Sequence, residues 1–151
     1  FGFIPENIWR EERMRAQDAV LHNIDFRAEG YDIDPAAVEL TLANAKKAGV
    51  EGYIKAAVRN IKEFTPPEDR CTVITNPPYG ERLLDIRAAE EIYRIMGEKF
   101  VRGNGRKYFI ISPHDDFEKL FGAVADKRRK LYNGMIKCQL YMYFKSPEKK
   151  V

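Results

Sequence analysis

Residues 76–79, Asn-Pro-Pro-Tyr, are the part of this chain whose residue types and spacing are best suited to chemistry. They follow the apolar pair Val73-Ile74, which predicts a short buried strand, and Gly80 closes the segment. Two consecutive prolines fix two backbone φ angles and remove two amide donors, so we expect a stiff, extended loop. Such a loop holds a side-chain amide and carbonyl oxygens where a planar amino group docks, and Tyr79 adds an aromatic face that suits a nucleobase. The alternative is a Pro-rich turn without a function, and the preceding strand favours the functional loop.

Two further polar groups follow predicted strands. A short strand beginning at Ala28 ends at an acidic turn, where Asp34 and Pro35 have the types expected for a helix N-cap and first turn. Ligands of open parallel sheets bind beyond the carboxyl ends of the strands. Asp32 is therefore a candidate for accepting both ribose hydroxyls of a nucleoside, with a second turn acid as the alternative. Asn60 follows the next strand and is a candidate for bonding an adenine edge, or an ordinary polar loop residue.

Alternating strands and helices must position these side chains. Apolar periodicity and Gly/Pro punctuation predict helices over residues 6–22, 36–48, 88–100 and 115–122. Strands are expected over 53–58, 71–75 and 107–112, in addition to the one that begins at Ala28. The segments 127–132 and 135–144 flank Asn133-Gly134, which predicts a terminal hairpin. The pattern indicates an α/β fold whose sheet is mainly parallel with an antiparallel edge.

The composition is that of one ordinary globular domain. The chain has 151 residues, of which 44% are hydrophobic and 32% charged, and no uninterrupted apolar run approaches 18 residues, which excludes a membrane span. Cys71 and Cys138 both fall in predicted strands without metal-ligand spacing, which indicates buried free thiols in a reducing cytoplasm and no metal site. Residues 121–151 contain eight basic and two acidic side chains, which suits a polyanion such as RNA or an ordinary solvated surface.

The acidic turn, the helix after it and the Asn-Pro-Pro-Tyr loop together resemble Rossmann-like methyltransferases that use S-adenosylmethionine. The run Asn76–Leu83 narrows the resemblance to bacterial 23S (large-subunit) ribosomal RNA guanine-N2 methyltransferases, whose relatives are often labelled N6-adenine-specific DNA methylases. Residues 115–122 and 127–137 also resemble that family, as does the opening Phe1–Phe3 with Trp9, so the likeness covers essentially the whole chain.

The resemblance implies a fold, a cofactor and residue roles. It implies a Rossmann-like class I methyltransferase sheet and transfer of a methyl group from S-adenosylmethionine to the exocyclic N2 amine of a guanine in ribosomal RNA. The Asn76 side-chain oxygen and the Pro77 carbonyl would accept hydrogen bonds from that amine, and Tyr79 would stack on the flipped base. The implied catalytic residues are Asn76, Pro77, Pro78 and Tyr79; the implied cofactor contacts are Asp32, Ile33, Asn60 and Asn76; the implied substrate contacts are Tyr79, Arg82, Lys127 and Arg128.

Two departures from the family pattern qualify these expectations. The family's glycine-rich first motif and its strand are missing, and Gly103-x-Gly105 follows a helix and precedes a strand, the wrong order for cradling a cofactor. Residues 1–151 are therefore expected to be part of a catalytic domain, with that motif and a THUMP domain upstream in the same polypeptide. Asn60 stands where many relatives carry Asp. Methylation of adenine N6 in DNA or of a protein glutamine amide remains an alternative, and an inactive fragment that binds nucleic acid is an alternative of another class.

Overall fold

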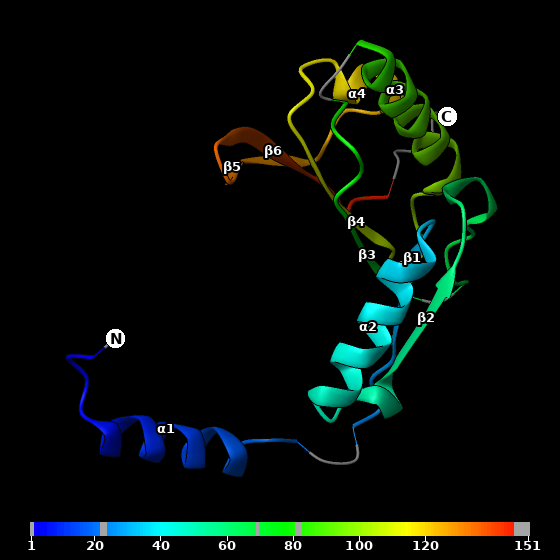
Figure 1. The fold of residues 1–151 in the computed structure, drawn as a ribbon. Helices are drawn as coiled ribbons and strands as arrows, with labels where there is room; N and C mark the ends of the chain where they lie inside the picture. The colour runs from blue at the N-terminus through cyan, green and yellow to red at the C-terminus, as the bar shows by residue number, and fades with distance from the viewer. Residues whose placement is uncertain (1, 22–23, 69, 81–82, 147–151) are drawn as a thin grey trace. The chain divides into compact units, whose positions relative to one another are not determined.

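The computed structural model describes residues 2–21, 24–68, 70–80 and 83–146, which form two compact units, Phe1–Ala57 and Val58–Val151 (Figure 1). Within the described ranges, no helix has the length and apolar content that a membrane crossing requires.

The first unit contains α1 (Glu6–Asp18), β1 (Ala28–Asp32) and α2 (Pro35–Lys47), and a 3₁₀ turn leads into β2 (Ile54–Val58), which pairs with β1. The predicted start of α2 is confirmed: the Asp34 side chain accepts a hydrogen bond from the Ala36 N–H at 2.9 Å, and Pro35 is in the first turn. The helix expected over residues 6–22 ends at Asp18. None of the residues of α1 is buried, so packing does not stabilise further turns.

The second unit is built on a four-stranded sheet of β3 (Thr72–Thr75), β4 (Lys107–Ser112), β6 (Ile136–Tyr143) and β5 (Lys127–Asn133), in the order β3-β4-β6-β5. β3 and β4 are parallel, whereas β6 is antiparallel to both β4 and β5. The α/β class and the terminal hairpin are confirmed. The described strands do not form one mainly parallel sheet, however, because the hairpin supplies half of the larger sheet.

The hairpin turn lies one residue later than expected. Asn133 pairs with Ile136 as the last residue of β5, so the two-residue turn is Gly134-Met135 rather than Asn133-Gly134. Gly134 has a φ of +59°, which a glycine adopts without strain at the first position of a two-residue hairpin turn. The Asn133 side chain is thereby available for contacts outside the turn.

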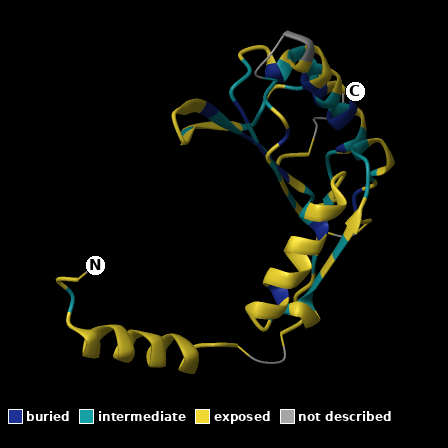
Figure 2. Ribbon diagram, viewed as in Figure 1, coloured by how far each residue is buried: buried dark blue, intermediate teal, exposed yellow. Residues whose placement is uncertain are grey.

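An aromatic core joins the sheet to α3 (Leu83–Lys99) and α4 (Phe117–Phe121). The Phe117 ring lies 4.4 Å from the Tyr141 ring and 5.1 Å from the Tyr93 ring, and the Phe100 and Tyr108 rings stack at 4.8 Å. Figure 2 shows buried segments on both helices. Tyr141 and Tyr143 of β6 are buried and pack in this core.

The helix expected from Ala88 begins five residues earlier, at Leu83, because the preceding loop closes directly against it. Gly80 has a φ of +71°, and a Cβ at this position would lie 2.5 Å from the Ile86 Cα. Glycine is required at this residue both for its backbone conformation and for the close approach.

Cys71 is half-buried and lies just before β3, so its predicted place in the strand is wrong, whereas Cys138 is a buried free thiol as expected. β3 begins only where Thr72 pairs with Lys107. Burial raises the pKa of the Cys71 thiol, and the positive charge of Arg106 lowers it to a smaller extent.

Asp126 anchors the start of β5 and provides a test of stability against pH. Its carboxylate accepts hydrogen bonds from the Arg102 guanidinium at 3.0 Å and from the backbone N–H groups of Phe144 at 2.6 Å and Lys145 at 2.8 Å. Burial alone would raise the pKa of Asp126, but these backbone N–H groups and Arg102 outweigh it, so its pKa lies below the ordinary 3.8. The contribution to stability is therefore present above pH 3.8 and is lost as the pH falls through the lowered pKa.

We expect Asp126→Asn to lower the free energy of unfolding near neutral pH by about 1.5–3 kcal/mol, since hydrogen bonds to charged groups are lost. The variant should also show a smaller further loss of stability than the wild type below pH 4, as measured by urea denaturation at a series of pH values. Parallel acid profiles for the two proteins would contradict this assignment.

Candidate functional site

The loop after β3 and the loop after β4 leave the same edge of the second unit's sheet, because these two strands are parallel. Ser112, the last residue of β4, pairs with Gln139 of β6, so the hairpin from Cys138 to the turn continues past that edge. The register therefore brings three segments together that are far apart in sequence: residues 76–80, residues 113–116 and the end of β5. This edge contains the Asn-Pro-Pro-Tyr loop that the sequence singles out.

Asn76 and Tyr79 contact each other within the loop, and the hairpin contacts them from outside. The Tyr79 hydroxyl donates to the Asn76 Oδ1 at 2.6 Å and accepts from the Asn133 Nδ2 at 3.0 Å. Burial raises the pKa of Tyr79 despite its hydrogen bond with Asn133, so the hydroxyl is a donor at neutral pH. A carboxamide oxygen has two lone pairs, so Asn76 can accept a second hydrogen bond from a ligand.

The two prolines face different surroundings. Pro77 is buried, whereas Asn76 before it and Pro78 after it are exposed. The Pro78 carbonyl accepts a hydrogen bond from the Tyr93 hydroxyl of α3 at 3.0 Å. One side of the loop is therefore fixed to the body of the unit, while the Asn76 carboxamide stands at its surface.

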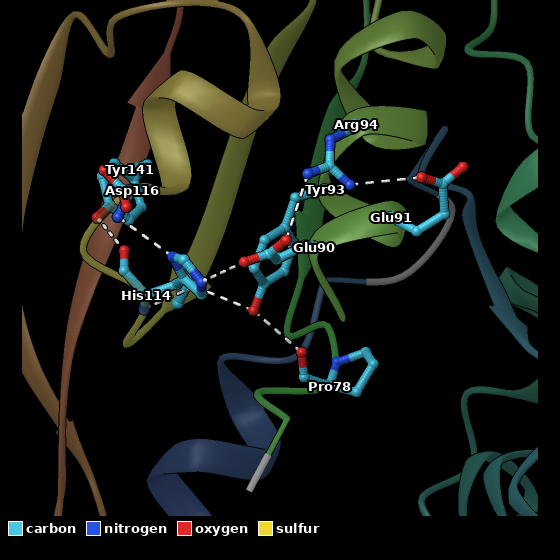
Figure 3. A network of polar contacts seen from close by, with 9 residues as sticks. Pro78, Glu90, Glu91, Tyr93, Arg94, His114, Asp116 and Tyr141 are labelled. Carbon is cyan, nitrogen blue, oxygen red and sulfur yellow. Dashed lines mark hydrogen bonds and ion pairs between the residues drawn. The ribbon is translucent and has the colours of Figure 1, made fainter. Parts of the chain in front are cut away.

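A network of polar groups continues from this contact under the loop (Figure 3). The Ser112 Oγ donates to the Tyr93 hydroxyl at 3.2 Å and accepts from the His114 N–H at 3.1 Å. The His114 Nδ1 accepts from the Asp116 N–H at 3.2 Å, which leaves the ring proton on Nε2, 3.5 Å from the Glu90 Oε1. His114 lies in the loop after β4, and these contacts hold its side chain in place.

The structure places the candidate cofactor residues in separate units. Asp32 ends β1, and its Oδ1 accepts the Asp34 N–H at 2.9 Å, while the exposed Ile33 lies between them. Asn60 lies in the second unit and uses its Oδ1 to cap a 3₁₀ turn, accepting from the Lys62 N–H at 3.0 Å. The N–H₂ group of Asn60 would therefore have to make any hydrogen bond to a nucleobase. A common site for Asp32, Asn60 and Asn76 stays a prediction.

The candidate substrate residues of the hairpin lie on its exposed strand. Lys127 is exposed, and the Arg128 side chain is 58% exposed with its guanidinium 3.5 Å from the Glu118 carboxylate. Lys130 lies 5.2 Å from the ring centre of Tyr132, which is itself exposed. Arg82 and its neighbour Glu81 lie outside the described residues.

Three residues of this edge have roles that sequence reasoning missed. The sequence pattern indicates Tyr93 only as part of the apolar face of a helix, and Asn133 only as a turn residue. Ser112 is predicted only as the last residue of a strand, but its hydroxyl binds the Tyr93 hydroxyl. The available signal was a serine ending a strongly apolar strand, since a buried hydroxyl requires a partner.

Comparisons with known proteins identify the class to which this fold belongs. A family model described as "RMKL-like, methyltransferase domain" (UPF0020) matches residues 4–142. The chain belongs to this family.

Two curated relatives and one solved structure illustrate the similarity. YpsC of Bacillus subtilis, provisionally named an RNA methyltransferase, is 30% identical over 94% of this chain and 37% of its own length. The ribosomal RNA large subunit methyltransferase K/L of Shewanella amazonensis is 36% identical over 95% of this chain and 22% of its own length. A provisionally named methyltransferase solved in complex with SAH is 35% identical, with a TM-score of 0.85, over 97% of this chain and 39% of that one. The chain thus spans well under half of each of these relatives.

Proposed function

We propose that this chain is part of an enzyme that transfers a methyl group from S-adenosylmethionine to the exocyclic N2 amine of a guanine in large-subunit ribosomal RNA. The observation that carries the proposal is the Asn76 carboxamide, held at the carboxyl edge of the sheet on a loop that α3 and the hairpin fix from two sides. The relatives named as RNA methyltransferases support the substrate class, and the structure solved with SAH supports the cofactor.

The residues of the first strand end fit an adenosyl group in their chemistry. Asp32 is exposed and uses one carboxylate oxygen in its turn, so its other oxygen can accept ribose hydroxyls. Ile33 offers an exposed apolar surface beside it, and Asn60 retains its N–H₂ donors for an adenine edge. The cofactor supplies a methyl group bound to a positively charged sulfur.

The chemistry asked of the loop is positioning and charge stabilisation. A base amine is a weak nucleophile because its lone pair is delocalised into the ring. Hydrogen bonds from its two N–H groups to the Asn76 Oδ1 and the Pro77 carbonyl would raise the electron density on nitrogen and direct its lone pair outward. The Tyr79 ring would stack on the base, which has to leave its helix to enter the site. In the transfer, the amine lone pair would form the new N–C bond, and the electrons of the sulfur–methyl bond would return to sulfur, which becomes neutral. The methylated nitrogen would then lose one N–H proton to water and keep the electrons of that bond as its lone pair.

The exposed cations of the hairpin suit the phosphates of the RNA around the target base. Lys127 and Arg128 lie on β5, whose far end reaches Tyr79 through Asn133, and Arg82 follows the loop in sequence. Contacts of this kind position a nucleic acid without reading its sequence. We further propose that residues 1–151 act within a single catalytic domain, together with an upstream glycine-rich motif and a THUMP domain.

Transfer of tritium from labelled S-adenosylmethionine tests the proposal. The native full-length polypeptide is incubated in parallel with undermethylated ribosomal RNA, with DNA and with a mixture of proteins. We expect label in large-subunit ribosomal RNA, recovered as N2-methylguanosine after nuclease digestion. Label recovered as N6-methyladenine from DNA, or on glutamine, would replace the proposed substrate. Binding of RNA without any transfer would replace the proposed enzyme with a nucleic-acid-binding protein.

A further inference from the structure

The hydrogen bonds beneath the loop form a chain whose direction is fixed at both ends. The backbone N–H of His114 can only donate, and the Pro78 carbonyl can only accept. Between them stand two hydroxyls, so Ser112 must donate to Tyr93 and Tyr93 must donate to Pro78. Burial raises the pKa of Tyr93, although its hydrogen bond with Ser112 lowers it, so the hydroxyl keeps its proton at neutral pH.

Packing on all sides holds the Tyr93 side chain in one orientation. It is fully buried, and edge-to-face contacts hold its ring at 5.1 Å from Phe117 and 5.8 Å from His114. Ser112 is also fully buried and belongs to the central strand β4. Figure 3 shows the Tyr93 hydroxyl directed towards Pro78, the proline that lies two residues after Asn76. A fully buried hydroxyl group therefore connects β4 and α3 to the loop.

We propose that Tyr93 is a positioning residue for methyl transfer: its hydroxyl, directed by Ser112, fixes the Pro78 carbonyl and thereby the direction in which Asn76 presents its carboxamide. This inference rests on the proposed function of the loop. Two prolines transmit the constraint, since each fixes one φ angle between the anchored carbonyl and Asn76. Without the anchor the Pro78 carbonyl would turn to water and the loop would sample several orientations. A displacement of about 1 Å at a reacting group reduces a rate by up to about 100-fold.

Tyr93→Phe tests the inference, and Tyr108→Phe is its matched control. Tyr108 is likewise fully buried, and its hydroxyl donates to the backbone carbonyl of Val101 at 2.6 Å, with burial raising its pKa to about 12. Each variant removes the hydroxyl of a buried tyrosine that donates to a backbone carbonyl. Only the carbonyl bound by Tyr93, that of Pro78, belongs to the loop. Four quantities are measured on the native full-length polypeptide: the melting temperature, the affinity for S-adenosylmethionine, kcat, and the KM for ribosomal RNA.

We expect both variants to melt at similarly lowered temperatures and to bind the cofactor as the wild type does. Tyr93→Phe should lower kcat by about 10- to 100-fold with little change in KM, whereas Tyr108→Phe should keep kcat within about twofold. Ser112→Ala should give a smaller loss than Tyr93→Phe, because the Tyr93 hydroxyl would still reach Pro78.

Equal kcat values for the two tyrosine variants would overturn the role of Tyr93 and leave the proposed function standing. A fall in kcat that matches the loss of stability in both variants would have the same meaning. Absence of transfer by the wild type to any substrate would overturn the proposed function, and the inference with it.

Discussion

Asn76→Ala is expected to lower methyl transfer by about 100- to 1,000-fold while leaving the fold intact. Removing one preorganised hydrogen-bonding group from a catalytic site typically has an effect of this size. Asn76 is exposed, and the hydrogen bond that it makes with Tyr79 is local to the loop, so its removal should change the melting temperature little. Single-turnover rates at saturating ribosomal RNA and labelled cofactor give the effect on the chemical step.

Tyr79→Phe separates two explanations of such a loss. The Tyr79 hydroxyl donates to the Asn76 Oδ1, so Asn76→Ala also removes an anchor of the tyrosine ring. Tyr79→Phe loses the same hydrogen bond but keeps both the amide acceptor and the aromatic face, and should retain activity within about tenfold. If Tyr79→Phe falls as far as Asn76→Ala, then Asn76 acts only by holding Tyr79. If Asn76→Ala stays within a few-fold of the wild type, the proposed role of the carboxamide is wrong.

The elements of this chain that could be predicted are those specified by local chemistry. Asp34 and Pro35 start α2 because a carboxylate cap and a fixed φ act within one turn, whatever the rest of the fold does. The terminal hairpin follows from alternating strands around a glycine, although the turn moved by one residue because Gly134 takes its first position. The strand before the Asn-Pro-Pro-Tyr loop is found in the same way.

The parts that could not be predicted depend on contacts and strand pairings that the sequence pattern does not specify. α3 begins at Leu83 because Gly80 packs against the backbone at Ile86, a contact that periodicity does not report. The sheet is mixed because β4 pairs with β3 on one side and with β6 on the other, which strand sequences alone do not specify.

The candidate site divides in the same way. The loop and its amide could be found from four consecutive residues, whereas its supports come from α3, β4 and the hairpin. Asn133 reaches Tyr79 across 54 positions of sequence, and Tyr93 reaches Ser112 across 19. A tyrosine on an apolar helix face and an asparagine in a turn each have an ordinary structural explanation, so only the fold shows that they meet the loop.

Gly97→Ala is expected to destabilise the second unit by about 3 kcal/mol or more, although alanine is the better helix former. Gly97 lies within α3, and a Cβ there would be 2.0 Å from the carbonyl oxygen and 2.8 Å from the carbonyl carbon of Phe121. These are backbone atoms at the end of α4, so no side-chain rotation relieves the overlap. The two helices would have to separate, and the packing of Phe121 against Phe100 and Tyr143 would be lost with them. Urea denaturation followed by near-ultraviolet circular dichroism of the aromatic core measures the change.

Gly52→Ala, in the 3₁₀ turn of the first unit, is a control for the substitution itself, and its unfolding is followed by far-ultraviolet circular dichroism. The same Cβ is added at a position where no atom lies within 4 Å and where the backbone does not need a positive φ. This variant should be neutral or slightly more stable, since alanine restricts the unfolded chain. The comparison decides between helix propensity and packing as the reason for glycine at position 97. If propensity dominated, Gly97→Ala would raise the midpoint of denaturation, and the close approach of α3 to α4 would be refuted. A lowered midpoint only in Gly97→Ala would show that the contact between α3 and α4 tolerates no side chain at this position. The same two helices bring the Tyr93 and Phe117 rings together.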